Sequence, residues 1–312
     1  MLTIANLSGG RDSTAMVIRY LELGHEIDYI LFCDTGFEFK EMYEYIEKLD
    51  LYLQRNFNKS ITWLNKGGKE NADDEYTIFE KWAFIKPIEI GERATLKRGI
   101  PRLIGRDYCT RETKIRPTEK FVKDKCKDKF RVTALIGYTY AEVENGRVSN
   151  LDYAIAKYPL HEWGFNEKEV SDFLSERQIM NPLYNHFRRT GCFLCPKQSK
   201  ASLYNLYRHY PKEWELMKAW ELKAISLDCV NKSFKMKFLG QYEKEFEIQS
   251  KQGLLFDENE FSEYETCFCG RWYMNIKEYD YIEYRHTSLD FMERKLDVLK
   301  DKEWNFAQKH FI

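Results

Sequence analysis

Residues 2–13 read LTIANLSGGRDS, and this stretch decides the fold. Its first six residues, 2–7, are mostly apolar with β-branched types among them, a pattern typical of a buried strand. Two adjacent glycines, Gly9 and Gly10, then allow a sharp turn of the backbone. An apolar-periodic stretch follows and stops at Gly24, as a helix would. The sequence therefore predicts strand, glycine turn and helix in that order.

The glycine turn and the helix start together predict an anion site. The first N–H groups of a helix have no partner within the helix, and the positive end of its dipole favours negative charge. Adjacent glycines let backbone N–H groups come close to a ligand. Phosphate fits such a site, and an ordinary strand-to-helix turn is the alternative that these features leave open.

The loop at 8–13, SGGRDS, resembles the SGGxDS loop of the PP-loop ATP pyrophosphatases, in the superfamily of adenine nucleotide alpha-hydrolases. Every defined position of that loop is matched, whereas the lysine-containing Walker loop is not. In that superfamily the loop holds the pyrophosphate part of ATP. The resemblance implies that Ser8, Gly9, Gly10, Asp12 and Ser13 bind a nucleotide and that Arg11 and Asp12 act in catalysis.

Length and composition indicate the class of protein. A chain of 312 residues, with 32% charged and 43% hydrophobic residues, fits a globular enzyme of one large domain or a domain with an appendage. Its net charge of −1 gives no bulk reason to expect nucleic-acid binding, although a local basic stripe stays open. We see no membrane span and no signal peptide, and therefore expect a cytoplasmic protein. There, eight cysteines favour metal or redox chemistry over structural disulfides.

A second buried strand is predicted at 27–33, and Asp34, Thr35 and Gly36 follow it. Side chains at the carboxyl ends of parallel strands face the ligand crevice of an open sheet. Asp34 is therefore expected to bond a ribose hydroxyl or to orient a metal ion, with a plain turn as the alternative. The string at 34–46 resembles the same segment of phosphoadenosine phosphosulfate (PAPS) reductases, which implies nucleotide contacts at all three residues.

The stretch 102–122, RLIGRDYCTRETKIRPTEKFV, gathers cations suited to phosphate or sulfate, or else to a solvated helix start. It resembles the Cys-Cys-x-x-Arg-Lys segment of iron–sulfur sulfonucleotide reductases, whose paired cysteines ligate a [4Fe–4S] cluster. The resemblance implies that Cys109 is a ligand, that Arg111 binds the nucleotide and that Lys114 acts in catalysis. Thr110 stands where those enzymes have their second cysteine.

A further buried strand is predicted at 131–138, with Gly137 expected beside the nucleotide. PAPS reductase relatives commonly continue with Gly-x-Arg, an acidic residue and a second arginine. Here Thr139 stands at the first arginine position, and Arg147 comes further on. This departure weakens the expectation of the usual sulfate-bearing substrate.

Residues 158–196 return to the family pattern: Pro-Leu, Trp, a helix at 167–176, Asn-Pro-Leu-Tyr, and Arg-x-Gly-Cys-x-x-Cys-Pro. The resemblance covers residues 1–220 and implies an α/β fold, an open and mostly parallel sheet with helices on both faces. We expect a PP-loop domain at 1–222, with an insertion at 66–100 and a cysteine-bearing loop at 188–200. A single helix is expected from Leu203 to Leu222, and a mainly helical extension of unknown role at 223–312.

Cys192 and Cys195 form a CxxC motif bounded by glycine and proline, a spacing that lets two thiolates face one metal. With Cys109 they give three expected ligands of a [4Fe–4S] cluster. Cys269, with its neighbour Cys267, is the best candidate for a fourth ligand; an oxygen or nitrogen ligand or an open iron site is the other option. Zinc in place of the cluster and buried free cysteines are the alternatives.

Three functions follow as hypotheses. In the first, ATP with Mg²⁺ is cleaved at the α-phosphate, and the loop N–H groups, Arg11, Lys114 and the metal ion stabilise the developing charge. The adenylated site then accepts sulfur, as in the DNA phosphorothioation protein of this superfamily, which implies a sulfur donor or reductant protein and a nucleic-acid acceptor. The second is reduction of PAPS or adenosine phosphosulfate (APS) to sulfite, and the third is a non-catalytic nucleotide-binding regulator.

The loop ranks these hypotheses, because true reductases usually carry a degenerate version without its aspartate. The full SGGxDS of this chain therefore favours cleavage of ATP. A homo-oligomer is compatible with the sequence but not indicated by it.

Overall fold

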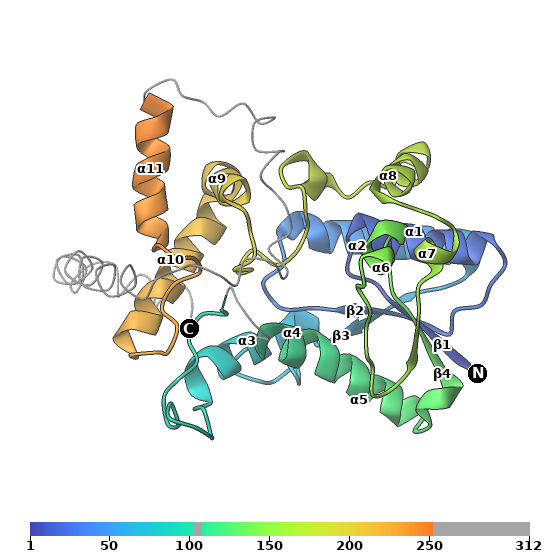
Figure 1. The fold of residues 1–312 in the computed structure, drawn as a ribbon, viewed down its shortest axis with the longest axis horizontal. Coiled ribbons are helices and arrows are strands. Elements are labelled where there is room, and N and C mark those ends of the chain that lie inside the picture. The colour runs from blue at the N-terminus through green and yellow to red at the C-terminus, as the bar shows by residue number, and fades with distance from the viewer. Residues whose placement is uncertain (103–107, 252–312) are drawn as a thin grey trace. The chain divides into compact units, whose positions relative to one another are not determined.

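The structure is a computed structural model that describes residues 1–102 and 108–251 (Figure 1). The chain divides into two compact units, the first comprising Met1–Pro196 with Leu227–Asn231. The described part of the second unit covers 197–226 and 232–251. The boundary expected after residue 222 falls inside a helix of the second unit.

A parallel five-stranded sheet lies at the centre of the described part of the first unit, in the order β3-β2-β1-β4-β5. The central strand is covered on both faces, because Ile4 and Ala5, which point to opposite faces, are both fully buried. Ile4 stands opposite Tyr29 and Ala134 of its two neighbours. The predicted open α/β fold is thus confirmed. The strands are β1 (Leu2–Asn6), β2 (Tyr29–Cys33), β3 (Ile61–Leu64), β4 (Val132–Leu135) and β5 (Ile155–Lys157).

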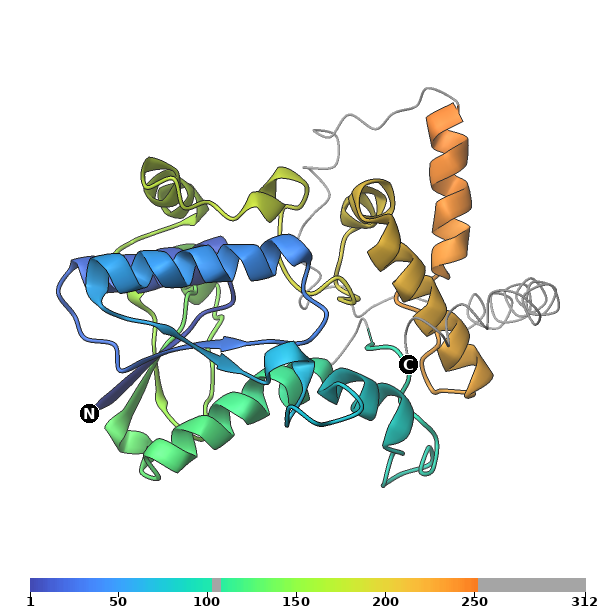
Figure 2. The ribbon, with the colours of Figure 1, turned by 180° about the vertical axis from the view of Figure 1, so that it is seen from behind.

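Helices cover both faces of this sheet, as expected. In both views α1 and α2 lie on one face and α5 on the other (Figures 1 and 2). The second helix packs through Met42, Tyr45, Ile46, Leu49 and Leu53, a stripe at helical spacing. The helices are α1 (Arg11–Glu22), α2 (Lys40–Phe57), α3 (Ile78–Glu80), α4 (Tyr108–Thr110), α5 (Arg116–Lys125), α6 (Tyr140–Glu144), α7 (Pro159–Glu162) and α8 (Glu167–Glu176).

Five short turns complete the described part of this unit. Three are 3₁₀ turns: η1 (Lys66–Gly68), η4 (Lys129–Arg131) and η5 (Pro182–Asn185). Two are π-helical turns, η2 (Lys81–Ile85) and η3 (Arg111–Ile115). A π-helical turn is rare and recurs at functional sites, so these two mark segments to inspect.

The loops that follow β2 and β3 are locked together by glycine. Gly36 and Gly68 both have positive φ, +79° and +71°. A Cβ on Gly68 would lie 2.6 Å from the Thr35 carbonyl oxygen, and one on Gly36 would lie 2.9 Å from the Gly67 oxygen. Only glycine lets the two backbones approach so closely, and this contact fixes the carboxyl edge of the sheet beside β1.

The second unit is described through α9 (Lys200–His209), α10 (Pro211–Ser226) and α11 (Leu239–Lys251). The single helix predicted from Leu203 to Leu222 is wrong, because Pro211 has no N–H to continue the ladder and the chain breaks at Tyr210. Of the predicted extension at 223–312, residues after 251 lie outside the described part. Within that part, no helix combines the length and apolar character needed to cross a bilayer.

Candidate functional site

The glycine loop between β1 and α1 is held in one conformation by its neighbours. Gly9 has φ +75°, and a Cβ there would lie 2.4 Å from the Met42 sulfur, so only glycine fits. The hydroxyls of Ser8 and Ser13 lie 3.0 Å apart, and Asn181 donates its amide to the Gly9 carbonyl at 2.8 Å. The loop is therefore shaped before any ligand arrives.

Asp12 stands at the start of α1 with an unusual carboxyl group. Its Oδ1 is buried and has no hydrogen-bond partner among the described residues. Burial raises its pKa to about 6; the Arg11 cation lowers that pKa, and the Glu142 and Glu167 carboxylates raise it further. A buried carboxyl oxygen without a protein donor suits a metal ion or a ligand that donates a hydrogen bond.

Arg11 does not extend alone from the loop. Its guanidinium lies 4.6 Å from the Tyr184 ring centroid. Its Nη1 donates to Ser171 at 3.3 Å, and Nη2 lies 3.7 Å from a Glu167 carboxylate oxygen. The Tyr184 hydroxyl also accepts the Arg11 backbone N–H at 2.9 Å. The catalytic role assigned to Arg11 stays a prediction.

Gly137 packs directly on this helix start. A Cβ at Gly137 would lie 2.8 Å from both the nitrogen and the Cα of Ser13, so any side chain would push β4 away from the loop. The nucleotide contact expected at Gly137 is untested, but the residue borders the loop as the sequence indicated. The same holds for the nucleotide roles of the loop residues themselves.

Arg147 is a cation near the loop that the sequence analysis left without a role. Its guanidinium lies 4.1 Å from the Tyr138 ring centroid and pairs with Glu142. The charges of Glu142 and Arg147 both act on Asp12. Arg147 directly follows Gly146, whose φ is +83°. A glycine at this point was the one feature of the sequence that could have indicated the turn before Arg147.

The Asp34 carboxylate is used within the protein. It is 2% exposed and accepts bonds from the Gly36 N–H at 2.8 Å, the Gly67 N–H at 2.7 Å and the Tyr43 hydroxyl at 2.9 Å. Such bonds hold the turn after β2 together, which is the structural role that the sequence left open for Asp34 as the alternative to ligand binding. Thr35 donates its hydroxyl to Glu38 at 2.9 Å. The nucleotide contacts expected at Asp34, Thr35 and Gly36 therefore stay predictions.

The thiols expected to hold a metal occupy one region of the first unit. Burial holds the pKa of Cys192 well above its usual value, the charges of Glu38, Cys195 and Cys109 raise it further, and Lys114 opposes them. The CxxC loop is tight, since the Cys195 N–H donates to the Cys192 carbonyl at 3.1 Å. Among the described residues, however, no three His, Cys, Asp or Glu side chains are grouped to hold a metal ion. Cys267 and Cys269 lie outside the described residues.

The opposite charges of Glu38 and Lys114 act on each other and on these thiols. Glu38 is 7% exposed, and burial raises its pKa while Lys114 lowers it. Burial lowers the pKa of Lys114, but the Glu38 charge, then those of Cys192 and Cys33, outweigh burial and raise it overall. Sequence patterns did not indicate Glu38, because an acidic residue ahead of a helix is ordinarily solvated. Arg111 lies largely exposed, 3.7 Å from Glu112, and its nucleotide role is untested.

The parallel sheet and the rigid glycine loop at its central strand define an adenine nucleotide alpha-hydrolase-like protein. Residues 3–198 match the family described as phosphoadenosine phosphosulfate reductase domain. The chain belongs to this family. Residues 3–198 include the glycine loop and the CxxC motif.

Similar proteins are known in sequence and in structure. Two uncharacterized proteins of Methanocaldococcus jannaschii are 29% and 24% identical; each alignment covers 69% of this chain, but only 39% and 46% of the relatives. This chain thus spans less than half the length of either relative. The PAPS reductase of Candida auris, in a phosphate complex, aligns with TM-score 0.39 at 11% identity, over 62% of this chain and 81% of that one. The U34-tRNA thiolase NcsA of Methanococcus maripaludis, with its [4Fe–4S] cluster, aligns with TM-score 0.36 at 14% identity, over 71% and 72%.

Proposed function

We propose that this protein is an enzyme that cleaves ATP at the α-phosphate and couples the cleavage to sulfur transfer. The observation that carries the proposal is the loop at 8–13: a preformed glycine turn, a helix start, and the unpartnered Asp12 oxygen beside them. Oxyanions bind to backbone N–H groups at such a helix start, and Mg²⁺ takes carboxylate oxygens. Asp12 supplies the carboxylate that a phosphate-bound magnesium ion needs.

The reaction proposed is a displacement at phosphorus. An acceptor oxygen forms a bond to the α-phosphorus, the bond to the bridging oxygen breaks, and pyrophosphate leaves with the electron pair. The loop N–H groups and the cations Arg11 and Arg147 would balance the charge that develops on the phosphates. Sulfide-level sulfur from a donor then forms a bond to the acceptor atom that carries the adenylated oxygen, and AMP leaves with that oxygen and the electron pair. We place this chemistry in the cytoplasm.

The thiol region would serve the sulfur step. Cys109, Cys192 and Cys195 are sulfur donors that act on one another electrostatically, which suits a [4Fe–4S] cluster, with Cys269 as the proposed fourth ligand and zinc as the alternative. A bound cluster would supply an electron or an iron that holds sulfur. Lys114 and Glu38 place a cation and an anion beside these thiols. Iron and acid-labile sulfide in anaerobically purified protein test the assignment.

The products of labelled ATP distinguish the candidate functions. With α-labelled ATP, a sulfide source and a pool of nucleic-acid acceptors, the proposal predicts AMP and pyrophosphate in equal amounts. The family match favours a second candidate, PAPS or APS reduction, which would release sulfite from the sulfated nucleotide without consuming ATP. Tight nucleotide binding with neither product would favour the regulatory alternative.

A further inference from the structure

Three cations gather around one indole ring on the first unit. The Lys86 ammonium lies 4.5 Å from the Trp82 ring centroid, the Arg98 guanidinium 4.7 Å, and the Arg116 guanidinium 5.8 Å. Cation–π attraction holds each of them, but like charges this close also repel one another. A bound anion would relieve that repulsion.

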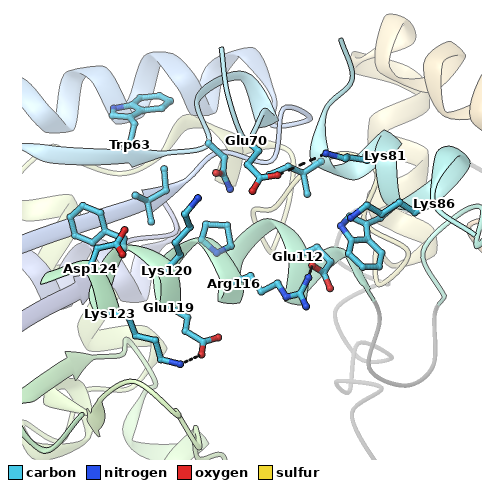
Figure 3. Close-up of a pocket in the computed structure, with 16 residues that line it drawn as sticks. Trp63, Glu70, Lys81, Lys86, Glu112, Arg116, Glu119, Lys120, Lys123 and Asp124 are labelled. Carbon is cyan, nitrogen blue, oxygen red and sulfur yellow. Dashed lines mark hydrogen bonds and ion pairs between the residues drawn. The ribbon is translucent and has the colours of Figure 1, made fainter. Parts of the chain in front are cut away.

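This ring borders a groove of about 570 Å³, within the range of roughly 300–1,000 Å³ usual for ligand sites. Figure 3 shows Trp63 at one end, Lys86 at the other and charged side chains of α5 between them. The groove therefore joins the edge strand β3, the π-helical turn η2 and helix α5. Its lining includes both aromatic rings, such as Trp63 and Trp82, and cations, such as Lys86 and Lys120.

The charges lining the groove are unevenly paired. Glu70, Glu112 and Glu119 pair with Lys81, Arg116 and Lys123, respectively. Lys86 and Lys120 also line the groove and, among the described residues, have no carboxylate within ion-pair distance; Asp124 is the remaining lining carboxylate. The Nη1 of Arg98 donates hydrogen bonds to the carbonyls of Lys86 and Pro87. The balance leaves the Trp82 end positive, as a local basic patch on a chain of net charge −1.

We propose that this groove binds a single strand of nucleic acid. Lys86 and Lys120, which line the groove, would hold phosphates, and Arg98 on the Trp82 ring adds positive charge beside them. The indoles of Trp63 and Trp82 offer apolar ring surface to the bases. Single-strand binding sites combine a positive groove with aromatic rings in this way. An acidic polypeptide would satisfy the cations but brings no bases to the rings, so nucleic acid is the better match.

The groove shares a structural element with the thiol region. The turn η3 carries Lys114, whose charge acts on Glu38 and the thiols, and also Glu112, which lines the groove and pairs with Arg116. Trp82 belongs to the π-helical turn η2, and Arg116 directly follows the π-helical turn η3. A nucleic-acid strand bound in this groove would lie next to the thiols of the proposed sulfur step. The inference deepens the proposed function and rests on it, because it assigns the acceptor class.

The test is fluorescence anisotropy of labelled single-stranded RNA and DNA oligonucleotides with the full chain. The double variant Lys86→Glu and Lys120→Glu should weaken binding about tenfold or more and lower the salt slope by about two. The matched control is Lys127→Glu with Lys129→Glu, which makes the same charge change at exposed lysines outside the groove. The control should retain wild-type affinity, and both variants should retain ATP binding.

Several results would overturn the inference. Equal losses in both double variants would show a general charge effect, and no loss in either would place the strand elsewhere. Polyglutamate that binds as tightly as an oligonucleotide of equal charge would replace nucleic acid by an acidic polypeptide. A preference between RNA and DNA identifies the natural strand. A wild-type protein that does not cleave ATP would instead contradict the proposed function. The dependence of oligonucleotide binding on the groove lysines would still hold.

Discussion

Replacing Asp12 by asparagine should stabilise the ligand-free protein while weakening its hold on magnesium-bound ATP. The Asp12 carboxyl is buried at the start of α1, and its Oδ1 has no partner in the described structure. Burial raises its pKa from 3.8 to about 6, so the folded protein resists ionising it. Asparagine keeps the shape and removes the charge.

The magnitude follows from the pKa. A change from 3.8 to about 6 corresponds to about 3 kcal/mol at ~1.4 kcal/mol for each tenfold change in proton affinity. The helix dipole favours the carboxylate by ~0.3–1 kcal/mol, so we expect Asp12→Asn to gain about 2 kcal/mol at pH 7.5. Below pH 3.8 both folded and unfolded chains hold the proton, and the gain should vanish. It should grow between pH 3.8 and about 6 and then level off.

Urea unfolding of both proteins across pH 4–8 measures this difference, and calorimetry measures MgATP affinity, which we expect to fall roughly tenfold in the variant. An asparagine variant that is no more stable than the wild type at pH 7.5 would refute the reasoning about burial. Unchanged MgATP affinity would refute the role of the carboxylate in holding the metal ion.

Gly9→Ala should destabilise the fold by more than Gly24→Ala: both have positive φ, but a Cβ at Gly9 would lie 2.4 Å from a methionine sulfur and one at Gly24 meets nothing within 4 Å. Equal losses in urea unfolding would contradict the steric argument. Burial raises the pKa of Glu221 to about 8 from 4.5, so wild-type stability should fall as pH rises between these values, and Glu221→Gln should flatten that fall in urea unfolding. A decline of the same slope in the variant would place its origin elsewhere. Cys192→Ser should lose iron and labile sulfide after anaerobic purification, whereas Cys126→Ser, whose thiol donates to the Asp128 carbonyl, should keep both; full iron in the first variant would remove Cys192 from the ligand set.

Local sequence predicted the elements with strong patterns. The strands predicted at 2–7, 27–33 and 131–138 contain β1, β2 and β4, and the helix expected at 167–176 has those bounds. Strand β5 was missed because its three residues, exposed or half-buried, carry no apolar alternation. Pro211 was read as part of a family-like helix although its chemistry breaks one.

The site was harder to predict than the fold, because its missing parts depend on contacts between distant segments. The charge that opposes buried Glu38 comes from Lys114, which stands far later in the chain. The cations on Trp82 come from three separate positions, and no spacing in the chain announces them. By contrast, the glycine loop is local, and its six residues were sufficient to locate it.

The most direct test of the central claim is NMR of glycine-labelled protein titrated with MgATP. The chain has 16 glycines, so the ¹⁵N-glycine spectrum is simple enough to assign by substitution. If the first helix start receives the nucleotide's phosphates, the amide signals of Gly9 and Gly10 should shift most and saturate with the measured affinity. Saturable MgATP binding that leaves both signals unmoved would contradict the account.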